Sequence, residues 1–265
     1  MTELRHLQLV ILHIMKDIDA LCAKNNIEYS LNGGSAIGAI RHKGFIPWDD
    51  DLDIQMTPTN YKKFIKVCRE QLDKEKYYFA EGTVDWPLDF CKIKLRGTKM
   101  IETEGYGGKE NELGIFVDIF RVDGAAPTKL GRYWQYFCAK YRTAYLINQR
   151  GYNSASLFKK IVMFLSFPQK FKPIRNFFKH EKEKYNGEET GYYGLLSEYT
   201  KVNHCFFPKH IFTNGTIKVD FEDTKLSILK EYDAYLKQVF GNYMQLPPLE
   251  KQVCEHHNGV DFGQY

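Results

Sequence analysis

A glycine turn followed by an aspartate-rich strand constrains this chain more than any other feature. The stretch "IEYSLNGG" alternates apolar and polar residues and ends on Gly33 and Gly34, which predicts a short strand entering a tight turn. "SAIGAIRHK" then has the spacing of a helix, with Ser35 as its expected N-cap. The next strand, "DLDIQM", places Asp51 and Asp53 on one face and apolar residues on the other. This order of elements predicts an α/β fold.

Further strands and helices extend this unit. Apolar residues three and four positions apart predict helices over residues 4–24 and 60–72. Alternating apolar residues predict three more strands, over residues 77–82, 89–98 and 114–124. Together these elements predict a mixed sheet flanked by helices.

The chain divides into three expected parts. Residues 1–128 form the catalytic core, and residues 129–185 form a helical insertion rich in basic and aromatic side chains. Residues 186–265 complete the active site, so that the whole is a single compact unit. In this last part we expect a boundary loop at residues 186–194. A strand pair is expected at residues 205–212 and 216–223, followed by a helix at residues 227–240.

The aspartates point to a site for a divalent cation. Residues i and i+2 of a strand share a face about 7 Å apart, so Asp51 and Asp53 can converge on one ion. Asp118 lies between Phe116 and Phe120 on one face of an apolar strand, where an unpaired carboxylate would be unfavourable, and it is the natural third ligand. Mg²⁺ suits such a set because it takes carboxylates, waters and substrate phosphates, and Mn²⁺ is the expected substitute.

The glycine turn supplies a complementary feature. Glycines allow close approach of a phosphate to the backbone, and a helix N-terminus offers free N–H groups. Each feature alone has a plainer explanation: a glycine turn needs no ligand, acidic clusters are mostly solvated, and a buried aspartate can hold a loop. Their order along the chain favours a metal and phosphate site.

Three blocks of sequence resemble a known family. The string "GGSAIGAIRHKGFIPWDDDLDI", the later "GIFVDIFRVDG" and the C-terminal "FGNYMQLPP" are similar to the LicD family of phosphotransferases, which is related to fukutin and to the nucleotidyltransferase superfamily. The chain departs from the family in two places. Ser35 stands where the family often has threonine, and Gln252 and Val253 stand where it often has an arginine.

The resemblance implies a reaction and its partners. A member of this family is expected to move phosphocholine from CDP-choline to a sugar hydroxyl of a teichoic acid, capsule or lipopolysaccharide precursor, an acceptor that is often lipid-linked. Asp51, Asp53 and Asp118 would then hold the metal and form the catalytic set, with Asp118 accepting the hydroxyl proton. Gly33, Gly34 and Ser35 would hold the donor phosphate.

Several other residues are candidates with open alternatives. Asp49 could bind a second metal or the choline ammonium, or orient its loop, whereas Asp50 is expected at the surface. Trp48 could face the quaternary ammonium or anchor the turn before it. His256 is expected to contact the donor or close over the site, because the spacing around it lacks a second ligand pair for zinc. Basic residues proposed to bind the diphosphate, or else to be solvated, are Arg41, His42, Lys92, Lys94 and Arg96.

The insertion at residues 129–185 has two explanations. Its mixture of aromatic and basic residues is typical of helices that lie on an anionic membrane surface. The same aromatics could instead form the core of an ordinary helical subdomain.

Composition excludes several classes of protein. A net charge of +4 is too small to indicate nucleic-acid binding. The six cysteines have no paired spacing, so free thiols in a cytoplasmic protein are expected. The N-terminus lacks the features of a signal peptide, and no apolar run is long enough to cross a membrane.

Two other functions remain as alternatives. A nucleotidyltransferase that moves a nucleoside monophosphate from a triphosphate to a small molecule would use the same metal site. A non-catalytic relative that only binds glycans would need no metal set at all.

Overall fold

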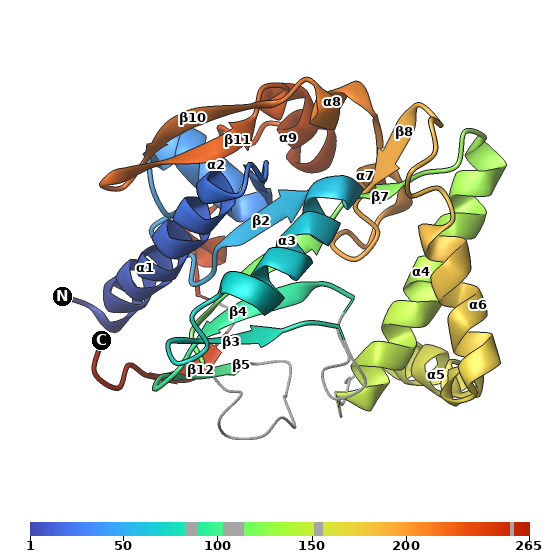
Figure 1. The fold of residues 1–265 in the computed structure, drawn as a ribbon, viewed down its shortest axis with the longest axis horizontal. Coiled ribbons are helices and arrows are strands. Elements are labelled where there is room, and N and C mark those ends of the chain that lie inside the picture. Colours follow the sequence, from blue (N-terminus) through green and yellow to red (C-terminus); the bar gives the residue numbers. More distant parts are fainter. Residues whose placement is uncertain (83–88, 103–113, 151–155, 255–256) are drawn as a thin grey trace.

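A five-stranded mixed sheet forms the centre of the molecule (Figure 1), with strand order β1-β2-β6-β4-β3. The structure, a computed structural model, describes residues 1–82, 89–102, 114–150, 156–254 and 257–265. The strands are β1 (Ser30–Leu31), β2 (Asp53–Met56), β3 (Tyr77–Ala80), β4 (Cys91–Leu95) and β6 (Phe116–Arg121). β2 and β6 run parallel and the other pairs antiparallel, so the predicted mixed sheet is confirmed.

Helices pack on this sheet through their apolar faces. α1 (Glu3–Lys24) contacts β4 and β6, and its predicted inward residues Leu7, Ile11 and Ile14 are buried. α3 (Pro58–Gln71) begins on a proline, which fits the first turn of a helix, and it packs on β2. α2 (Gly33–His42) lies between β2 and the C-terminal part of the chain.

The C-terminal part differs from its prediction. β10 (Thr216–Phe221) pairs with β11 (Thr224–Leu229) through a two-residue turn in which Glu222 has a φ of 55°. The expected partner segment instead forms β9 (Phe206–Pro208) of another sheet, so the predicted pairing is wrong. α9 (Tyr232–Phe240) begins five residues later than expected, because residues 227–229 belong to the hairpin.

Smaller elements complete the fold. β8 (Tyr192–Gly194) pairs with β9 and with β7 (Asp123–Gly124), so the end of the expected loop at 186–194 is a strand. The remaining elements are β5 (Lys99–Glu102), which pairs with β12 (His257–Asp261), α7 (Val202–Cys205), α8 (His210–Thr213) and the 3₁₀ turn η3 (Leu249–Lys251). All six cysteines are free thiols, as predicted.

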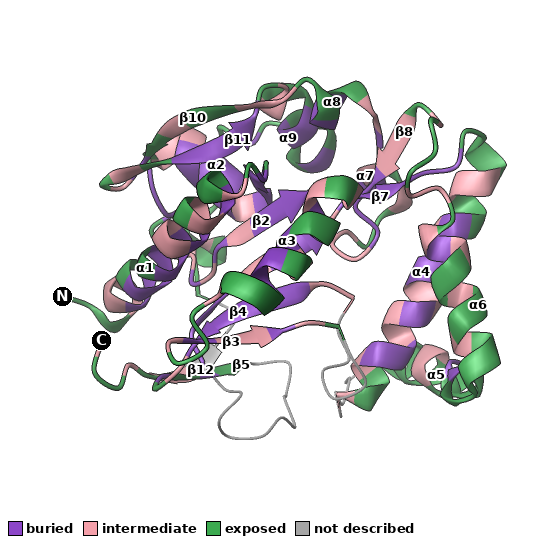
Figure 2. Cartoon of the chain, in the orientation of Figure 1, coloured by how far each residue is buried: buried purple, intermediate pink, exposed green. Residues whose placement is uncertain are grey.

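A group of three helices stands at one end of the sheet, at the right of Figure 1. It comprises α4 (Lys129–Gln149), α5 (Leu157–Leu165), the 3₁₀ turn η2 (Phe167–Lys170) and α6 (Lys172–Glu183), which we call the helical module. The helical character expected here is confirmed for these ranges. Figure 2 shows that α5 is largely exposed, in contrast to the inner side of α4.

A buried ion network ties the helical module to the rest of the chain. The Lys182 ammonium of α6 lies 2.7 Å from an oxygen of Asp89 and 3.6 Å from one of Asp123. Arg142 of α4 donates to Asp89 at 2.9 Å, and Arg121 at the end of β6 donates to Asp123 at 2.6 Å. These cations lower the pKa of Asp89 below its usual range despite its burial. The network fixes where the module sits.

Candidate active site

The strands that carry the predicted aspartates are neighbours in the sheet. Asp53 is the first residue of β2, and its direct partner in the parallel strand β6 is Asp118. Strands in a sheet lie about 4.8 Å apart, and residues in register point to the same face. The fold therefore places these two half-buried carboxylates side by side.

Three more carboxylates surround this pair. Burial raises the pKa of Asp53 well above its usual range, and negative charge on Asp51 and Glu198 raises it further. Asp118 and Asp49 act on Asp53 in the same direction. Because like charges shift a pKa only when they are close, these residues form one acidic cluster. The structure thus brings together all four predicted metal ligands and adds Glu198.

Lys92 supplies positive charge at the cluster. It is the register partner of Asp118 across the antiparallel strand β4, and its Nζ lies 3.1 Å from Asp118 Oδ1. The ammonium is almost completely buried and lies 3.4 Å from the centre of the Phe116 ring. Such a position favours the charged form of Asp118, which would be unfavourable on a buried strand without a partner.

The other two cations of the predicted basic strand have different surroundings. Lys94 is buried on the same face of β4 as Lys92, with its Nζ 5.4 Å from the Phe116 ring. A solvated face, the alternative for these two lysines, is therefore wrong. Arg96 lies beyond the end of β4, and its Nε donates to the carbonyls of Lys74 and Tyr77 at 2.9 and 3.2 Å. The structure does not bring Arg96 into the cluster.

The glycine turn begins α2 one residue after Asn32. The prediction that Ser35 caps this helix is wrong, because Asn32 is the N-cap and Gly33 begins the helix with a φ of 50°. Ser35 instead accepts a hydrogen bond from the backbone N–H of Asp53 at 2.9 Å. Its own hydroxyl proton can still be donated to a ligand. This bond fixes the start of α2 against the start of β2.

Two carboxylates lie against the glycines themselves. A Cβ on Gly34 would lie 2.9 Å from Asp49 Oδ2, and one on Gly33 would lie 3.7 Å from Glu198 Oε1. A side chain at Gly34 would therefore force Asp49 to move. The absence of side chains lets these carboxylates approach the first turn of α2, where the helix dipole favours negative charge.

Side chains from the C-terminal part of the chain contact the glycine turn. Tyr235 of α9 donates to Asn32 Oδ1, and the hydroxyls of Tyr199 and Tyr235 are 2.5 Å apart. The backbone N–H of Gly33 also interacts with the Tyr235 hydroxyl. Asn32 makes no side-chain bond to the first turn of α2. The backbone N–H groups of the next residues in that turn therefore remain uncapped by Asn32.

Glu198 is the site residue that sequence reasoning missed. It lies in the segment between β8 and α7, in the stretch "LLSEYTK", which has no periodicity or motif that would single it out. Burial raises its pKa to about 8, and the charges of Asp51 and Asp118 act in the same direction. Lys140 of α4 opposes this shift, and its Nζ donates to the Leu196 carbonyl at 2.8 Å. The helical module therefore contacts, through Lys140, the segment that carries Glu198.

Arg41 and His42 lie at the far end of α2. They follow Gly33 by eight and nine residues, so they lie about 12 Å along the helix from the glycine turn. Arg41 donates to the carbonyls of Tyr243 and Gln245 at 2.7 and 3.2 Å. The structure places these two residues away from the predicted phosphate site.

Trp48 has the surroundings expected of an anchor. It is half-buried against the hydrophobic core, and its ring meets that of His42 edge-on at 6.3 Å. Asp50, expected at the surface, is fully buried, and Cys254 Sγ donates to its Oδ2 at 3.1 Å. The surface prediction for Asp50 is therefore wrong. His256 lies outside the described residues.

The chemistry of the cluster fits a hard divalent cation. Its donors are carboxylate oxygens, the ligands that Mg²⁺ and Mn²⁺ prefer. Burial and then mutual repulsion raise the pKa of Asp53, and a bound cation would relieve the repulsion. Within the described part of the chain, no three His, Cys, Asp or Glu side chains are already arranged around a metal position.

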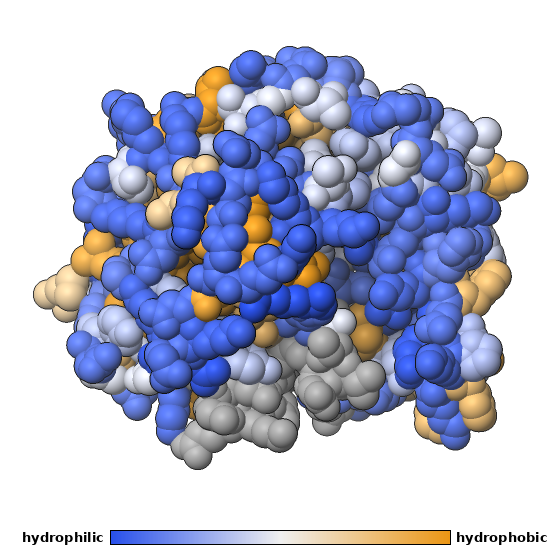
Figure 3. Space-filling view, viewed as in Figure 1, coloured by the Kyte–Doolittle hydropathy of each residue, from blue (hydrophilic) through white to orange (hydrophobic). Residues whose placement is uncertain are grey.

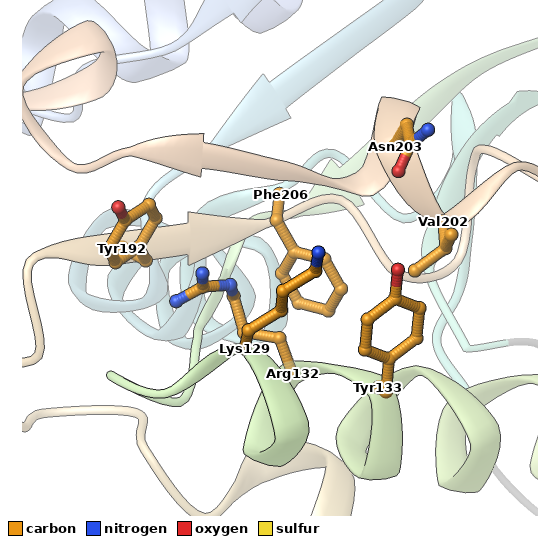
Figure 4. A pocket seen from close by; sticks show the side chains of 7 residues that line it. All are labelled: Lys129, Arg132, Tyr133, Tyr192, Val202, Asn203 and Phe206. Atoms are coloured by element: carbon orange, nitrogen blue, oxygen red, sulfur yellow. The ribbon is translucent and has the colours of Figure 1, made fainter.

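A separate pocket opens beside the helical module (Figure 4), with a volume of about 210 Å³. It is lined from α4 by Lys129, Arg132 and Tyr133, and from the facing segments by Tyr192, Val202, Asn203 and Phe206. The Arg132 guanidinium lies 4.0 Å above the Tyr192 ring and donates to two backbone carbonyls. Cations and aromatic faces can hold a polar ligand, but no predicted site residue lines this pocket.

The chain is similar to a known protein family and to several known proteins. The family model described as "LicD/FKTN/FKRP, nucleotidyltransferase domain" matches residues 26–143. The chain is 32% identical over 266 aligned residues to the lipopolysaccharide cholinephosphotransferase LicD of Haemophilus influenzae, an alignment that covers 96% of each chain. Uncharacterized proteins of Rickettsia prowazekii and Rickettsia typhi are each 56% identical over 41 residues, which is 16% of this chain and 15% and 13% of theirs.

Proposed function

This chain belongs to the LicD family, a family of transferases, and we propose that it transfers phosphocholine from CDP-choline to a sugar hydroxyl of a cell-surface glycan precursor. The support is the match to a lipopolysaccharide cholinephosphotransferase along 96% of both chains. That alignment is long enough to include the C-terminal segments that complete the carboxylate cluster. A lipopolysaccharide precursor is the first acceptor to test, followed by teichoic acid and capsule precursors.

The first turn of α2 would hold the donor phosphates. The N–H groups of Gly34 and Ser35 lie at the positive end of the helix dipole, and Asn32 does not cap them. The Ser35 hydroxyl accepts from Asp53 and can donate its proton to a phosphate oxygen. Donor binding would therefore place the diphosphate next to the carboxylate cluster.

Asp51, Asp53 and Asp118 would hold one or two Mg²⁺ or Mn²⁺ ions, with Asp49 as a further oxygen donor. When bound, such an ion neutralises charge on the transferred phosphoryl group and on the leaving CMP. The Lys92 ammonium, 3.1 Å from Asp118 Oδ1, would hold that carboxylate in place. The cluster would in this way contribute charge and position rather than covalent chemistry.

The transfer itself is a single displacement at phosphorus. The acceptor hydroxyl oxygen forms a bond to the phosphorus of phosphocholine, and the bond from that phosphorus to the CMP oxygen breaks with its electron pair leaving on CMP. The hydroxyl proton passes to a carboxylate of the cluster, a role we assign to Asp118. The observation that carries the proposal is that Asp53 and Asp118 are register partners on β2 and β6, while Asp49 lies against the glycine turn of α2.

Titration calorimetry with a nucleotide panel tests the donor. We would titrate CDP-choline, CDP-glycerol, CDP-ribitol, ATP, UTP and CTP into the protein with and without Mg²⁺. The expected result is that the protein prefers CDP-choline and binds it only with Mg²⁺. The Asp53→Asn variant is the control, because Mg²⁺ should no longer increase its affinity for CDP-choline. Preference for a triphosphate would instead assign a nucleotidyltransferase, and binding of glycans without any nucleotide would assign a non-catalytic relative.

A further inference from the structure

The outer face of the helical module exposes an unusual amount of apolar surface. α5 has no buried residue, and its side chains Leu157, Phe158, Ile161, Phe164 and Leu165 are 72%, 75%, 48%, 76% and 58% exposed. Phe167 on η2 and Phe171 before α6 continue this surface at 52% and 57%. Soluble proteins rarely leave a contiguous apolar patch of this kind without a partner. We call it the α5 face.

The apolar residues of α5 share one side of the helix. Positions 157, 158, 161, 164 and 165 follow the spacing of one helical face, whereas Val162 and Met163 lie outside that face and are half-buried. Between α4 and α6 the ring centre of Phe178 lies 4.5 Å from that of Tyr141 and 6.5 Å from that of Phe137, but Phe137 is 50% exposed and the other two side chains are half-buried. These rings contact one another without forming a buried core, and the α5 face lies outside them.

Basic residues border this face. Between Ser156 and His180 the sequence has six Lys or Arg and no Asp or Glu. Among the described residues, none of the six forms an ion pair. The Lys170 ammonium lies 4.1 Å from the Phe167 ring, so its apolar stem runs along the patch. Figure 3 shows apolar and hydrophilic side chains next to one another at the lower right, over α5.

We propose that the α5 face binds the surface of an anionic lipid bilayer. Apolar side chains would enter the boundary between headgroups and acyl chains, and the bordering cations would lie at the level of anionic headgroups. α5 has nine residues and so a length of about 13.5 Å, too short to cross an apolar layer of about 30 Å. No helix in the described ranges combines the length and apolarity of a membrane span. The binding is therefore peripheral.

A second copy of the chain fits this face less well. In a symmetric dimer the face would meet itself, so the unpaired cations of one copy would oppose those of the other. An anionic bilayer complements both the apolar side chains and the charge. Lys140 of α4 contacts the segment that carries Glu198, so docking by α5 would hold the site near the membrane surface. The proposal does not depend on which reaction the site performs.

Vesicle sedimentation with the full chain tests the proposal. Vesicles of phosphatidylcholine with phosphatidylglycerol should carry the wild type down, and pure phosphatidylcholine vesicles should bind at least about tenfold less, because each cation near an anionic surface contributes roughly a fivefold factor. The double variant Phe158→Ser, Phe164→Ser should bind at least about 100-fold less, since each side chain loses its apolar burial. The double variant Lys159→Glu, Lys160→Glu should bind at least about 25-fold less.

Matched variants elsewhere keep the test specific. Leu249→Ser removes an 81% exposed apolar side chain on η3. The double variant Lys62→Glu, Lys66→Glu reverses two exposed charges on α3. Both control variants should bind the vesicles like the wild type. Circular dichroism checks that all variants fold. Absence of wild-type binding, or equal binding by the α5 and control variants, would overturn the proposal. A wild-type dimer that becomes monomeric in the α5 phenylalanine variant, without vesicle binding, would assign the face to a second copy.

Discussion

Two groups of buried charge in this molecule differ in how their members affect one another. In the network between the sheet and the helical module, three cations form ion pairs with three carboxylates and lower the pKa of Asp89. The cations are Lys182, Arg142 and Arg121, and the carboxylates are Asp89, Asp123 and Glu183. In the carboxylate cluster, acidic groups surround acidic groups, and the pKa values of Asp53 and Glu198 are raised. The first arrangement favours its charges in the folded protein, and the second disfavours them.

The ion network stabilises the fold, whereas the carboxylate cluster has the properties of a functional site. A balanced network holds two parts of a fold together, because each charge is satisfied by its neighbours. An acidic cluster that shifts its own pKa values upward gains nothing for stability and is typical of a site that binds a cation or reacts. The comparison predicts that mutations in the cluster affect activity, whereas mutations in the network affect stability.

The largest expected effect is on activity, from Asp53→Asn. The change removes one proposed metal ligand and should lower phosphocholine transfer by about 1000-fold or more, in the range of losses for groups that stabilise transition-state charge. In the presence of a chelator, its free energy of unfolding should be unchanged or higher, because one like charge leaves the cluster. Rates of CMP release and urea denaturation measure the two quantities. A variant with normal activity would contradict the site assignment.

Lys182→Met should have the largest effect on stability. Lys182 has no exposed surface and lies between Asp89 and Asp123, so its removal leaves buried carboxylates without their main cation. We expect the free energy of unfolding to fall by about 3–5 kcal/mol. Lys184→Met is the matched control, because the exposed Lys184 ammonium lies 3.7 Å from the Glu181 carboxylate and should contribute less than about 1 kcal/mol. Equal urea midpoints for the two variants would show that the network does not hold the module.

The two regions should respond to pH in opposite directions. The folded state raises the pKa of Glu198 to about 8, so the stability that its protonated form confers is complete at low pH and is lost as pH rises through about 8. The folded state lowers the pKa of Asp89. The ionised carboxylate therefore stabilises the fold when the pH is above the ordinary pKa of an aspartate, and this stability is lost as the pH falls below that pKa.

Urea unfolding of metal-free protein at several pH values measures this contrast. Relative to wild type, Glu198→Gln should become progressively more stable between about pH 5 and pH 9, because glutamine cannot ionise. Asp89→Asn should be destabilised at neutral pH and approach the wild type as the medium becomes strongly acidic. The same trend for both variants would show that the two groups of charge do not differ as described.

The smallest expected effect comes from Gly34→Ala. Its Cβ would lie 2.9 Å from Asp49 Oδ2, so the carboxylate must shift, and we expect activity to fall about tenfold if that side chain positions the donor or metal. Stability should change by less than about 1 kcal/mol, since Gly34 lies in a helix and alanine is the better helix former. Gly259→Ala, where a Cβ meets no atom within 4 Å, is the control for the activity assay. Unchanged activity in Gly34→Ala would separate Asp49 from the site.

Local patterns in the sequence were enough for the elements and for part of the site. Spacing of apolar residues predicted α1 and α3, and alternation predicted the strands that carry Asp53 and Asp118. The segment at residues 129–185 was expected to be helical without bounds for its individual helices. Motif resemblance identified the family. These inferences succeed because helical and strand periodicity, and the chemistry of a short motif, depend on residues close together in the chain.

What only the tertiary structure decided depends on pairing between distant segments. The register of β2, β6 and β4 places Asp53, Asp118 and Lys92 in one row. Folding of the C-terminal part brings Glu198 to the glycine turn, and α2 carries Arg41 away from it. Asp50 is buried although its sequence neighbours are acidic. The sequence by itself determined which chemical groups this protein has, and long-range packing decided which of them meet, because no local pattern encodes a contact between segments far apart in the chain.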